Sequence, residues 1–240
     1  MLPHSESPGQ RVSISVIIPT LNEEDWLGAT LDSLTNQPEP WEIIVSDAGS
    51  TDATRRIAET AATIVSSDIG RARQMNAGAL AANGTVLLFV HADTRLDPNA
   101  FAAVRRALRN PAVQAGAFQL RFDKAGFWPG LYALCARVHW HRVVFGDRGL
   151  FVRRTAFEAV GGFPEVPILE DQMMVHNLHL SGAFAYLPIP ATTAWRRFAA
   201  HGPIRQQVRN LYVMAQFLLG RPPHKIRHDY PACRQVSQRS

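Results

Sequence analysis

The sequence predicts an α/β fold, an αβα sandwich around a mostly parallel sheet, and three observations lead to this prediction. Short β-branched runs alternate with helical stretches of about 10 to 15 residues through the first half of the chain, which is typical of successive βαβ units. The runs are almost continuously apolar, as strands covered on both faces are. The chain has 240 residues, 46% hydrophobic and 19% charged, so it can build a sizeable core and is neither disordered nor fibrous.

Three strands and four helices are expected in the first half. The strands are apolar runs that end in polar residues, at 13–19, 41–46 and 85–90. The helices show apolar residues at helical spacing or a helix start signal, at 23–36, 53–62, 72–82 and 97–109.

The alternation breaks after residue 110. Strands are then expected at 112–122 and 149–152, and helices at 127–144, 171–181 and 204–219. The second half therefore mixes elements that complete the sheet with helices that have no following parallel strand.

No linker between two independent domains is visible. We expect a leader at residues 1–11 and one domain over 12–200. Its first half is 12–110 and its second half 111–200, and residues 201–240 add an amphipathic helix and a basic tail.

The last expected helix carries one apolar stripe, made of Ile204, Val208, Leu211, Tyr212, Ala215 and Leu218. We favour packing of this stripe into the core or a homodimer interface. The alternative is a peripheral contact with an anionic membrane, because basic residues occur on and after the helix: Arg205, Arg209, Arg221, Lys225 and Arg227.

Composition excludes several classes of protein. Two cysteines, Cys135 and Cys233, cannot form a disulfide framework or a four-thiolate zinc site. No apolar run reaches the ~18 residues of a membrane span, and the first residues lack the pattern of a signal peptide. We expect a cytoplasmic protein, peripheral at the inner face of the membrane if the last helix docks there.

The net charge of +5 is unevenly distributed. Residues 1–120 carry 9 Arg against 13 Asp and Glu, a net charge of −4, and residues 121–240 carry 16 Arg and Lys against 7 acids, a net charge of +9. The split suggests two faces with different partners, although uniformly solvated arginines remain the alternative. Aromatic interleaving and RNA-binding signatures are missing, so we expect no nucleic-acid partner.

Polar residues follow each expected strand of the first half. They are Thr20, Asn22 and Glu23 after the first strand, Asp47 and Ser50 after the second, and His91 and Asp93 after the third. Ligands of open parallel sheets bind at the carboxyl ends of the strands, so three such ends indicate a ligand cleft. The alternative for Asn22 and Ser50 is that each caps the helix behind it.

Two common nucleotide motifs are missing. The turn from Thr20 to Glu24 has no glycine, which excludes a dinucleotide fingerprint, and the only lysines, Lys124 and Lys225, exclude a P-loop. Acidic strand ends instead suit a metal-bound diphosphate, or hydrogen bonds to a nucleobase and ribose.

Four segments together resemble the family-2 glycosyltransferases of GT-A fold: SVIIPTLNEE, IIVSDAGSTDAT, RARQMNAGALAANGTVLLFVHADT and GDRGLFVRRTAFEAVGGFPEVPILED. The likeness spans about residues 13–200. It implies a Rossmann-like nucleotide-binding half followed by an acceptor half. It is greatest to a short bacterial subgroup with HAD in place of the acidic triplet, a late Arg196-Arg197 pair and an LLGRPP segment. That subgroup is associated with arsenosugar biosynthesis.

The resemblance implies a nucleotide-sugar donor, for which we expect a UDP-sugar. The donor-binding residues it implies are Thr20, Asn22, Glu23, Asp47, Arg71, His91 and Asp93. Asp93 stands where the family binds a divalent cation, Mn²⁺ or Mg²⁺, which stabilises the diphosphate leaving group. His91 replaces the first aspartate of the D-x-D pattern, and Ala48 replaces a second aspartate of the preceding loop. For His91 the alternative is a strand-end histidine bonded to backbone.

The resemblance also implies an acceptor side. Asp171 matches the general base, and Glu170 would position it, which gives inversion at the anomeric carbon. Asp147, Arg148, Arg196 and Arg197 would face the acceptor or a phosphate. The alternative for Glu170 and Asp171 is that acidic residues merely stabilise a helix N-terminus. The alternative for Asp147 and Arg148 is that they are ordinary turn residues.

We therefore expect an inverting, metal-assisted glycosyltransferase that acts on a small-molecule or lipid-linked hydroxyl acceptor. One alternative is a non-catalytic module that binds a nucleotide sugar on a degenerate scaffold, supported by His91 and Ala48. The other is a sugar nucleotidyltransferase, which needs a glycine-rich first loop that this chain lacks.

Overall fold

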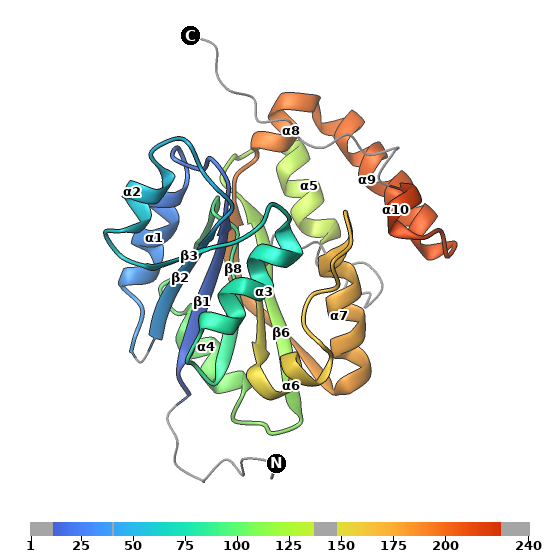
Figure 1. Ribbon diagram of the computed structural model, residues 1–240. Helices are drawn as coiled ribbons and strands as arrows, with labels where there is room; N and C mark the ends of the chain where they lie inside the picture. The colour runs from blue at the N-terminus through green and yellow to red at the C-terminus, as the bar shows by residue number, and fades with distance from the viewer. Residues whose placement is uncertain (1–11, 40, 137–147, 227–240) are drawn as a thin grey trace.

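The fold is one eight-stranded sheet between two layers of helices (Figure 1). The computed structural model describes residues 12–39, 41–136 and 148–226. The strand order is β3-β2-β1-β4-β7-β6-β8-β5. The strands are β1 Ile14–Thr20, β2 Trp41–Asp47, β3 Thr63–Ser66, β4 Val86–Phe89, β5 Thr94–Leu96, β6 Val113–Phe122, β7 Leu150–Arg153 and β8 Ala183–Thr193.

The pairing divides the sheet as the sequence predicts. Strands β3, β2, β1 and β4 are parallel neighbours, which makes the first half a parallel α/β unit. Strand β7 pairs antiparallel with both β4 and β6, β8 is parallel to β6, and β5 is antiparallel to β8. The α/β prediction, with a mostly parallel first half and a mixed second half, is confirmed.

The helices are α1 Leu27–Thr35, α2 Thr54–Ala58, α3 Arg71–Ala81, α4 Ala100–Ala107, α5 Phe127–Cys135, α6 Arg154–Ala159, α7 Glu170–Ser181, α8 Arg196–His201, α9 Pro203–Leu218 and α10 Pro223–Ile226. Helices α1, α2 and α4 pack on one face of the sheet, and α3, α6 and α7 on the other. Helix α8 lies at the top of the molecule in Figure 1, and α9 and α10 continue from it down the right-hand side.

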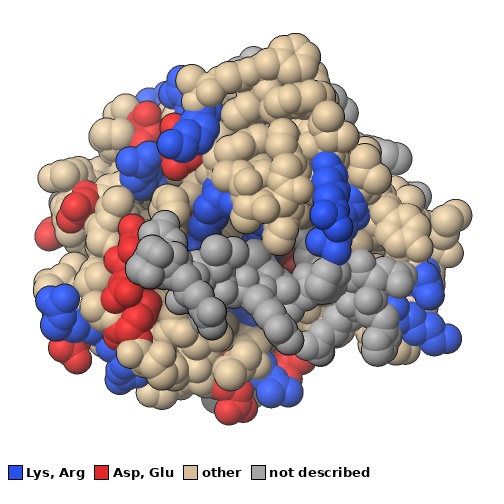
Figure 2. Space-filling view, turned by 90° about the horizontal axis from the view of Figure 1, so that it is seen from above, with Lys and Arg blue, Asp and Glu red and all other residues tan. Residues whose placement is uncertain are grey.

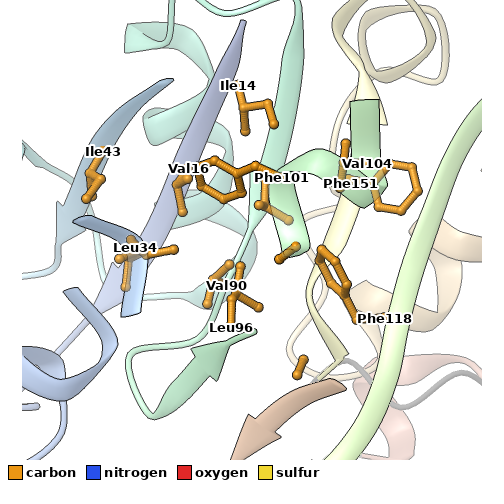
Figure 3. Close-up of a cluster of buried hydrophobic side chains, with 14 of the residues drawn as sticks. Ile14, Val16, Leu34, Ile43, Val90, Leu96, Phe101, Val104, Phe118 and Phe151 are labelled. Carbon is orange, nitrogen blue, oxygen red and sulfur yellow. The ribbon is translucent and has the colours of Figure 1, made fainter. Parts of the chain in front are cut away.

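Alternation along the central strand creates the two cores. Ile14, Val16 and Ile18 of β1 point toward α1 and α4, whereas Ile17 points toward α3. Figure 3 shows the first core, in which Phe101 of α4 lies among residues of the central strands. All five side chains are fully buried, so the sheet and its helices form a rigid base for the loops at its edge.

Three strands were not predicted. Strand β3 is half exposed and β5 has three residues, so neither shows a clear apolar pattern. Strand β8 contains Pro188 and Pro190, which normally argue against a strand. A bulge accommodates them: the pairing with β6 steps from Tyr186 opposite Ala117 to Pro190 opposite Gln119.

Four predicted helices have different bounds. The helix predicted at 53–62 ends at Ala58, and the one predicted at 97–109 spans only Ala100–Ala107. The helix predicted at 23–36 begins at Leu27 rather than at residue 23, because residues 24–26 form a turn. The helix predicted at 127–144 ends at Cys135, and residues 137–144 lie outside the described part of the chain. Helix α8, which was not predicted, crosses the expected boundary at residue 200.

The apolar stripe of α9 does not pack into the core, so that interpretation of the helix is wrong, whereas a homodimer interface and a membrane contact stay predictions. Ile204, Val208, Leu211 and Tyr212 are each more than half exposed. Among the described residues, no helix is long and apolar enough to cross a membrane.

Candidate active site

The carboxyl ends of β1, β2 and β4 meet at the upper edge of the sheet in Figure 1, where the polar residues predicted from the sequence also lie. Figure 2 looks down onto this edge: acidic and basic side chains gather next to each other beside a broad surface of other residues.

The loops after β1 and β2 are tied directly to each other. The backbone N–H of Asn22 donates to Ser50 Oγ at 2.9 Å, and Asn22 Oδ1 accepts from the Thr51 N–H at 2.8 Å. Asn22 has a φ of 53°, a left-handed conformation that asparagine tolerates well. Neither α1 nor α2 has a side-chain N-cap, so the capping alternative for Asn22 and Ser50 is wrong.

Asp47, at the end of β2, is fully buried and organises the second loop. Its carboxylate accepts from Ser50 Oγ at 2.5 Å, from the Ser50 N–H at 3.1 Å and from Thr20 Oγ1 at 3.1 Å, and it pairs with Arg55 at 3.2 Å. Burial alone would raise the pKa of Asp47, but the hydrogen bonds from Ser50, Arg55 and Thr20 outweigh it and lower the pKa. These bonds hold the loop in shape, and a contact of Asp47 with the donor stays a prediction.

Gln74 of α3 is a buried residue that the sequence did not single out. Its Nε2 donates to the carbonyl of Thr20 at 2.7 Å and to that of Ser46 at 3.3 Å. The amide thereby joins the ends of β1 and β2 to α3. The sequence does not show that Gln74 is buried, because it lies among other polar residues of α3 and the apolar side of that helix consists mostly of small residues.

Arg196, the first residue of α8, lies between two of the predicted donor-binding acids. Both terminal nitrogens bond to Glu23, at 2.7 and 2.9 Å, and Nε donates to Asp93 Oδ2 at 2.7 Å. The guanidinium also lies 5.4 Å from the ring centroid of Trp26. Burial alone would lower the pKa of Arg196, but Glu23 and Asp93 raise it, so the cation is fixed at this edge.

Backbone contacts bring Asp93 and Arg196 together. The carbonyl of Asp93 accepts from the Ala194 N–H at 3.1 Å, next to the antiparallel pairing of β5 with β8. Asp123 accepts from the Trp195 N–H at 2.8 Å, which orients the start of α8. On the other side of the turn, Thr30 donates to the carbonyl of Ala92 at 2.7 Å.

Glu170 and Asp171 form the first turn of α7, as predicted. Arg71, the first residue of α3, lies 3.2 Å from Glu170 and 3.7 Å from Asp171. A contact of Arg71 with the diphosphate therefore stays a prediction. A small hollow separates Asp171 from the strand ends, and its lining also includes Pro19, Met75, Phe89, Val90, His91 and Leu150.

The remaining predicted residues differ in their surroundings. Arg148 is buried, donates to the carbonyl of Ala136, and has its pKa lowered by that burial. Arg197 is partly exposed and has no hydrogen bond or ion pair to the described residues. Asp147 lies outside the described part of the chain.

The described residues contain no group of three or more His, Cys, Asp and Glu that could hold a metal ion on its own. Glu23 and Asp93 nevertheless point at one common cation, the guanidinium of Arg196. Mg²⁺ usually takes one or two carboxylates together with substrate phosphates and water, so Asp93 with Glu23 fits such an ion.

The mixed sheet, with acidic residues at its strand ends and an acidic pair on α7, is the arrangement of a GT-A fold. The sequence profile described as Glycosyl transferase family 2 matches residues 15–163. The chain therefore belongs to glycosyl transferase family 2, as the resemblance predicted.

One curated relative is the validoxylamine A glucosyltransferase of Streptomyces hygroscopicus subsp. limoneus. It is 34% identical over 110 residues, which cover 41% of this chain and 24% of the relative. The chain thus spans about a quarter of that relative's length.

Solved structures share the fold. The mannosyltransferase PcManGT from Pyrobaculum calidifontis, in complex with GDP-Man and Mn²⁺, superposes with a TM-score of 0.67 at 24% identity, covering 90% of this chain and 68% of that one. The structure of S. aureus TarS 1–349 in complex with UDP-GlcNAc superposes with a TM-score of 0.63 at 19% identity, covering 76% of this chain and 58% of that one. Glucosyl-3-phosphoglycerate synthase from Mycobacterium tuberculosis, in a complex that contains Mn²⁺ and UDP, superposes with a TM-score of 0.63 at 20% identity, covering 91% of this chain and 87% of that one.

Proposed function

We propose that this chain transfers a sugar from a nucleotide-diphosphate sugar to a hydroxyl acceptor, with inversion at the anomeric carbon. Asp171 is the general base that takes the acceptor proton, and Glu170, held by Arg71, positions it. One observation carries the proposal: Asp171 and His91 line the same hollow at the carboxyl edge of the sheet. At the same edge, Thr20 at the end of β1 is hydrogen-bonded to Asp47 at the end of β2.

On the donor side, Thr20, Asn22 and Glu23 line the nucleoside position with the second loop. Arg196 offers a fixed cation for the diphosphate, and Asp93, assisted by Glu23, would hold Mn²⁺ or Mg²⁺. A bound divalent cation supplies charge stabilisation for the departing diphosphate. Arg197, next to Arg196, is the residue we assign to an acceptor phosphate.

The donor is proposed from the solved relatives, whose complexes hold UDP-GlcNAc, GDP-Man and UDP. Two of these three are uridine nucleotides, which supports a UDP-sugar. For the acceptor, the likeness to the HAD subgroup supports a hydroxyl compound of arsenosugar biosynthesis, and a lipid-linked acceptor is the other candidate.

A donor panel tests the proposal. The protein is incubated with UDP-, GDP- and dTDP-sugars with and without Mn²⁺, and release of nucleoside diphosphate is measured. We expect release from one nucleotide class. Asp171→Asn should lower transfer about 10²–10⁴-fold while donor affinity stays within about twofold. The matched control is Asp25→Asn, an exposed acid before α1.

Donor binding without release by the native chain would favour the non-catalytic module instead. Full activity of Asp171→Asn would remove Asp171 as the base.

A further inference from the structure

Helix α9 is oriented with its apolar side toward solvent. Ile204, Val208 and Leu211 are 57%, 60% and 58% exposed, whereas Gln206 and Gln216 are 2% and 7% exposed. The 3.6-residue period places these apolar residues together on the side of the helix opposite the buried Gln206 and Val213. A surface helix of a monomer normally shows the reverse arrangement, so this face is built to contact something else.

Helix α5 adds apolar surface next to α9. The hydroxyl of Tyr132 on α5 donates to the carbonyl of Pro203 at 3.1 Å, and its ring stacks with Trp195 at 5.8 Å. Phe127 and Leu134 of α5 are 74% and 58% exposed. Of the twelve large hydrophobic residues that are exposed in the described part of the chain, nine lie on α5, on α9 or at Leu219. We call the exposed apolar side chains of α5 and α9 the docking face.

The segment that contains α8, α9 and α10 carries basic residues and no acids. Residues 172–228 contain no Asp or Glu and seven Arg and Lys. Arg205 is exposed and next in sequence to Ile204 of the stripe. Apolar side chains flanked by arginines match an anionic lipid surface, where the apolar groups enter the headgroup boundary and the arginines meet phosphates.

A second copy of the chain fits this face less well. A twofold interface brings the same patch of each subunit together, and arginines would then face arginines with no acid from residues 172–228 to compensate. We propose that the docking face binds peripherally to an anionic lipid bilayer.

Docking would also orient the cleft. Helix α9 follows α8, and Arg196 at the start of α8 contacts Asp93 and Glu23. Helix α8 lies at the top of the molecule in Figure 1, above the edge at which the strand ends meet, and α9 continues from it. A lipid-linked acceptor would therefore reach the cleft from the bilayer. This last consequence depends on the proposed transferase activity, whereas the docking does not.

Vesicle flotation of the full chain, without donor, tests the docking. Vesicles of phosphatidylcholine alone are compared with vesicles containing 30% phosphatidylglycerol (about one lipid in three, enough to give a surface potential). We expect binding to the anionic vesicles that falls as salt is raised. The double variant Val208→Glu/Leu211→Glu should lower the partition coefficient at least about tenfold. Leu80→Glu, which changes an 87% exposed leucine of α3, is the matched control and should bind as the native chain does.

The readouts separate the possibilities. Equal binding of the double variant and the native chain, or no binding of the native chain, overturns the proposal. A native dimer in light scattering that the double variant abolishes, without vesicle binding, assigns the face to a second copy instead. Because donor hydrolysis is measured separately in solution, loss of the docking result and loss of the transferase result are distinguishable.

Discussion

Arg196 donates from Nε to Oδ2 of Asp93 at 2.7 Å, across 103 residues of sequence. The same guanidinium forms a two-pronged bond with Glu23, so one cation neutralises acids from two different strand ends. The arrangement places a fixed positive charge where a diphosphate would arrive. It also means that a divalent cation at Asp93 competes with Arg196 for the same oxygens.

Replacing Arg196 with alanine should therefore raise the affinity for Mn²⁺ in the absence of nucleotide. Both carboxylates approach one guanidinium to within 2.9 Å, so both are within reach of one ion. Since the site is partly open to solvent, we expect a modest gain of about tenfold, or ~1.4 kcal/mol, by calorimetry.

The matched control is Arg197→Ala, which removes the neighbouring arginine without breaking an ion pair to the described residues. Equal Mn²⁺ affinities of the two variants would show that Arg196 does not compete with the metal.

A second prediction concerns Arg71 and Arg73, which are two positions apart on α3. Glu170, the partner of Arg71, is 6% exposed, and loss of the arginine leaves a buried carboxylate with less compensation. Arg71→Ala should lower the free energy of unfolding by about 2 kcal/mol in urea. Arg73 pairs with the exposed Glu165, and Arg73→Ala should cost less than about 0.5 kcal/mol. Similar losses for both variants would contradict the assignment of Glu170 as a buried partner.

The site could be predicted only in part, because its parts are brought together by strands that the sequence does not reveal. The acids at the ends of β1, β2 and β4 follow strongly apolar runs and were found. The contact of Arg196 with Asp93 depends on the pairing of Thr94 with Thr193 between β5 and β8. A three-residue strand and a strand with two prolines carry almost no local signal, so tertiary packing decides them.

The same limit applies to α9. The spacing of its apolar residues predicts the helix correctly. The spacing shows that the helix has an apolar side, but not whether that side faces the protein core or the solvent. The buried side is instead chosen by Gln206, Val213 and Gln216, which face the rest of the protein. By contrast, β1 and α3 were predicted to within one residue at each end, because each combines a clear pattern with flanking turn residues.

A third prediction uses the lowered pKa of Asp47. A carboxyl whose pKa is lower in the folded state than its ordinary value of 3.8 stabilises the fold above that value, and the contribution is lost as pH falls through the folded pKa. Asp47→Asn should cost about 2 kcal/mol at pH 7, because five hydrogen-bond donors, including the Arg55 guanidinium, lose a charged acceptor.

The difference between native and Asp47→Asn should shrink as the pH is lowered below 3.8, measured by urea unfolding at several pH values. Asp32→Asn, an exposed acid of α1, should change stability by less than about 0.5 kcal/mol. A cost for Asp47→Asn that is the same at pH 7 and pH 3 would mean that the charge of Asp47 is not what stabilises the loop.

A fourth prediction concerns two helical glycines with opposite surroundings. A Cβ at Gly78 of α3 would come within 2.4 Å of Ile17 Cγ2, a fully buried atom of the central strand, so α3 or β1 would have to move. A Cβ at Gly28 of α1 would have its nearest neighbour, Ile57, at an ordinary 4.0 Å. Gly78→Ala should therefore destabilise the fold by about 1–3 kcal/mol through overpacking. Gly28→Ala should stabilise it by about 0.5–1 kcal/mol, because alanine restricts the unfolded chain and favours the helix.

Thermal and urea unfolding of both variants measure whether Gly78→Ala lowers and Gly28→Ala raises the stability of the fold. Since α3 also carries Gln74 beneath the loops of the site, a shift of α3 in Gly78→Ala should weaken donor binding as well, whereas Gly28→Ala should leave it unchanged.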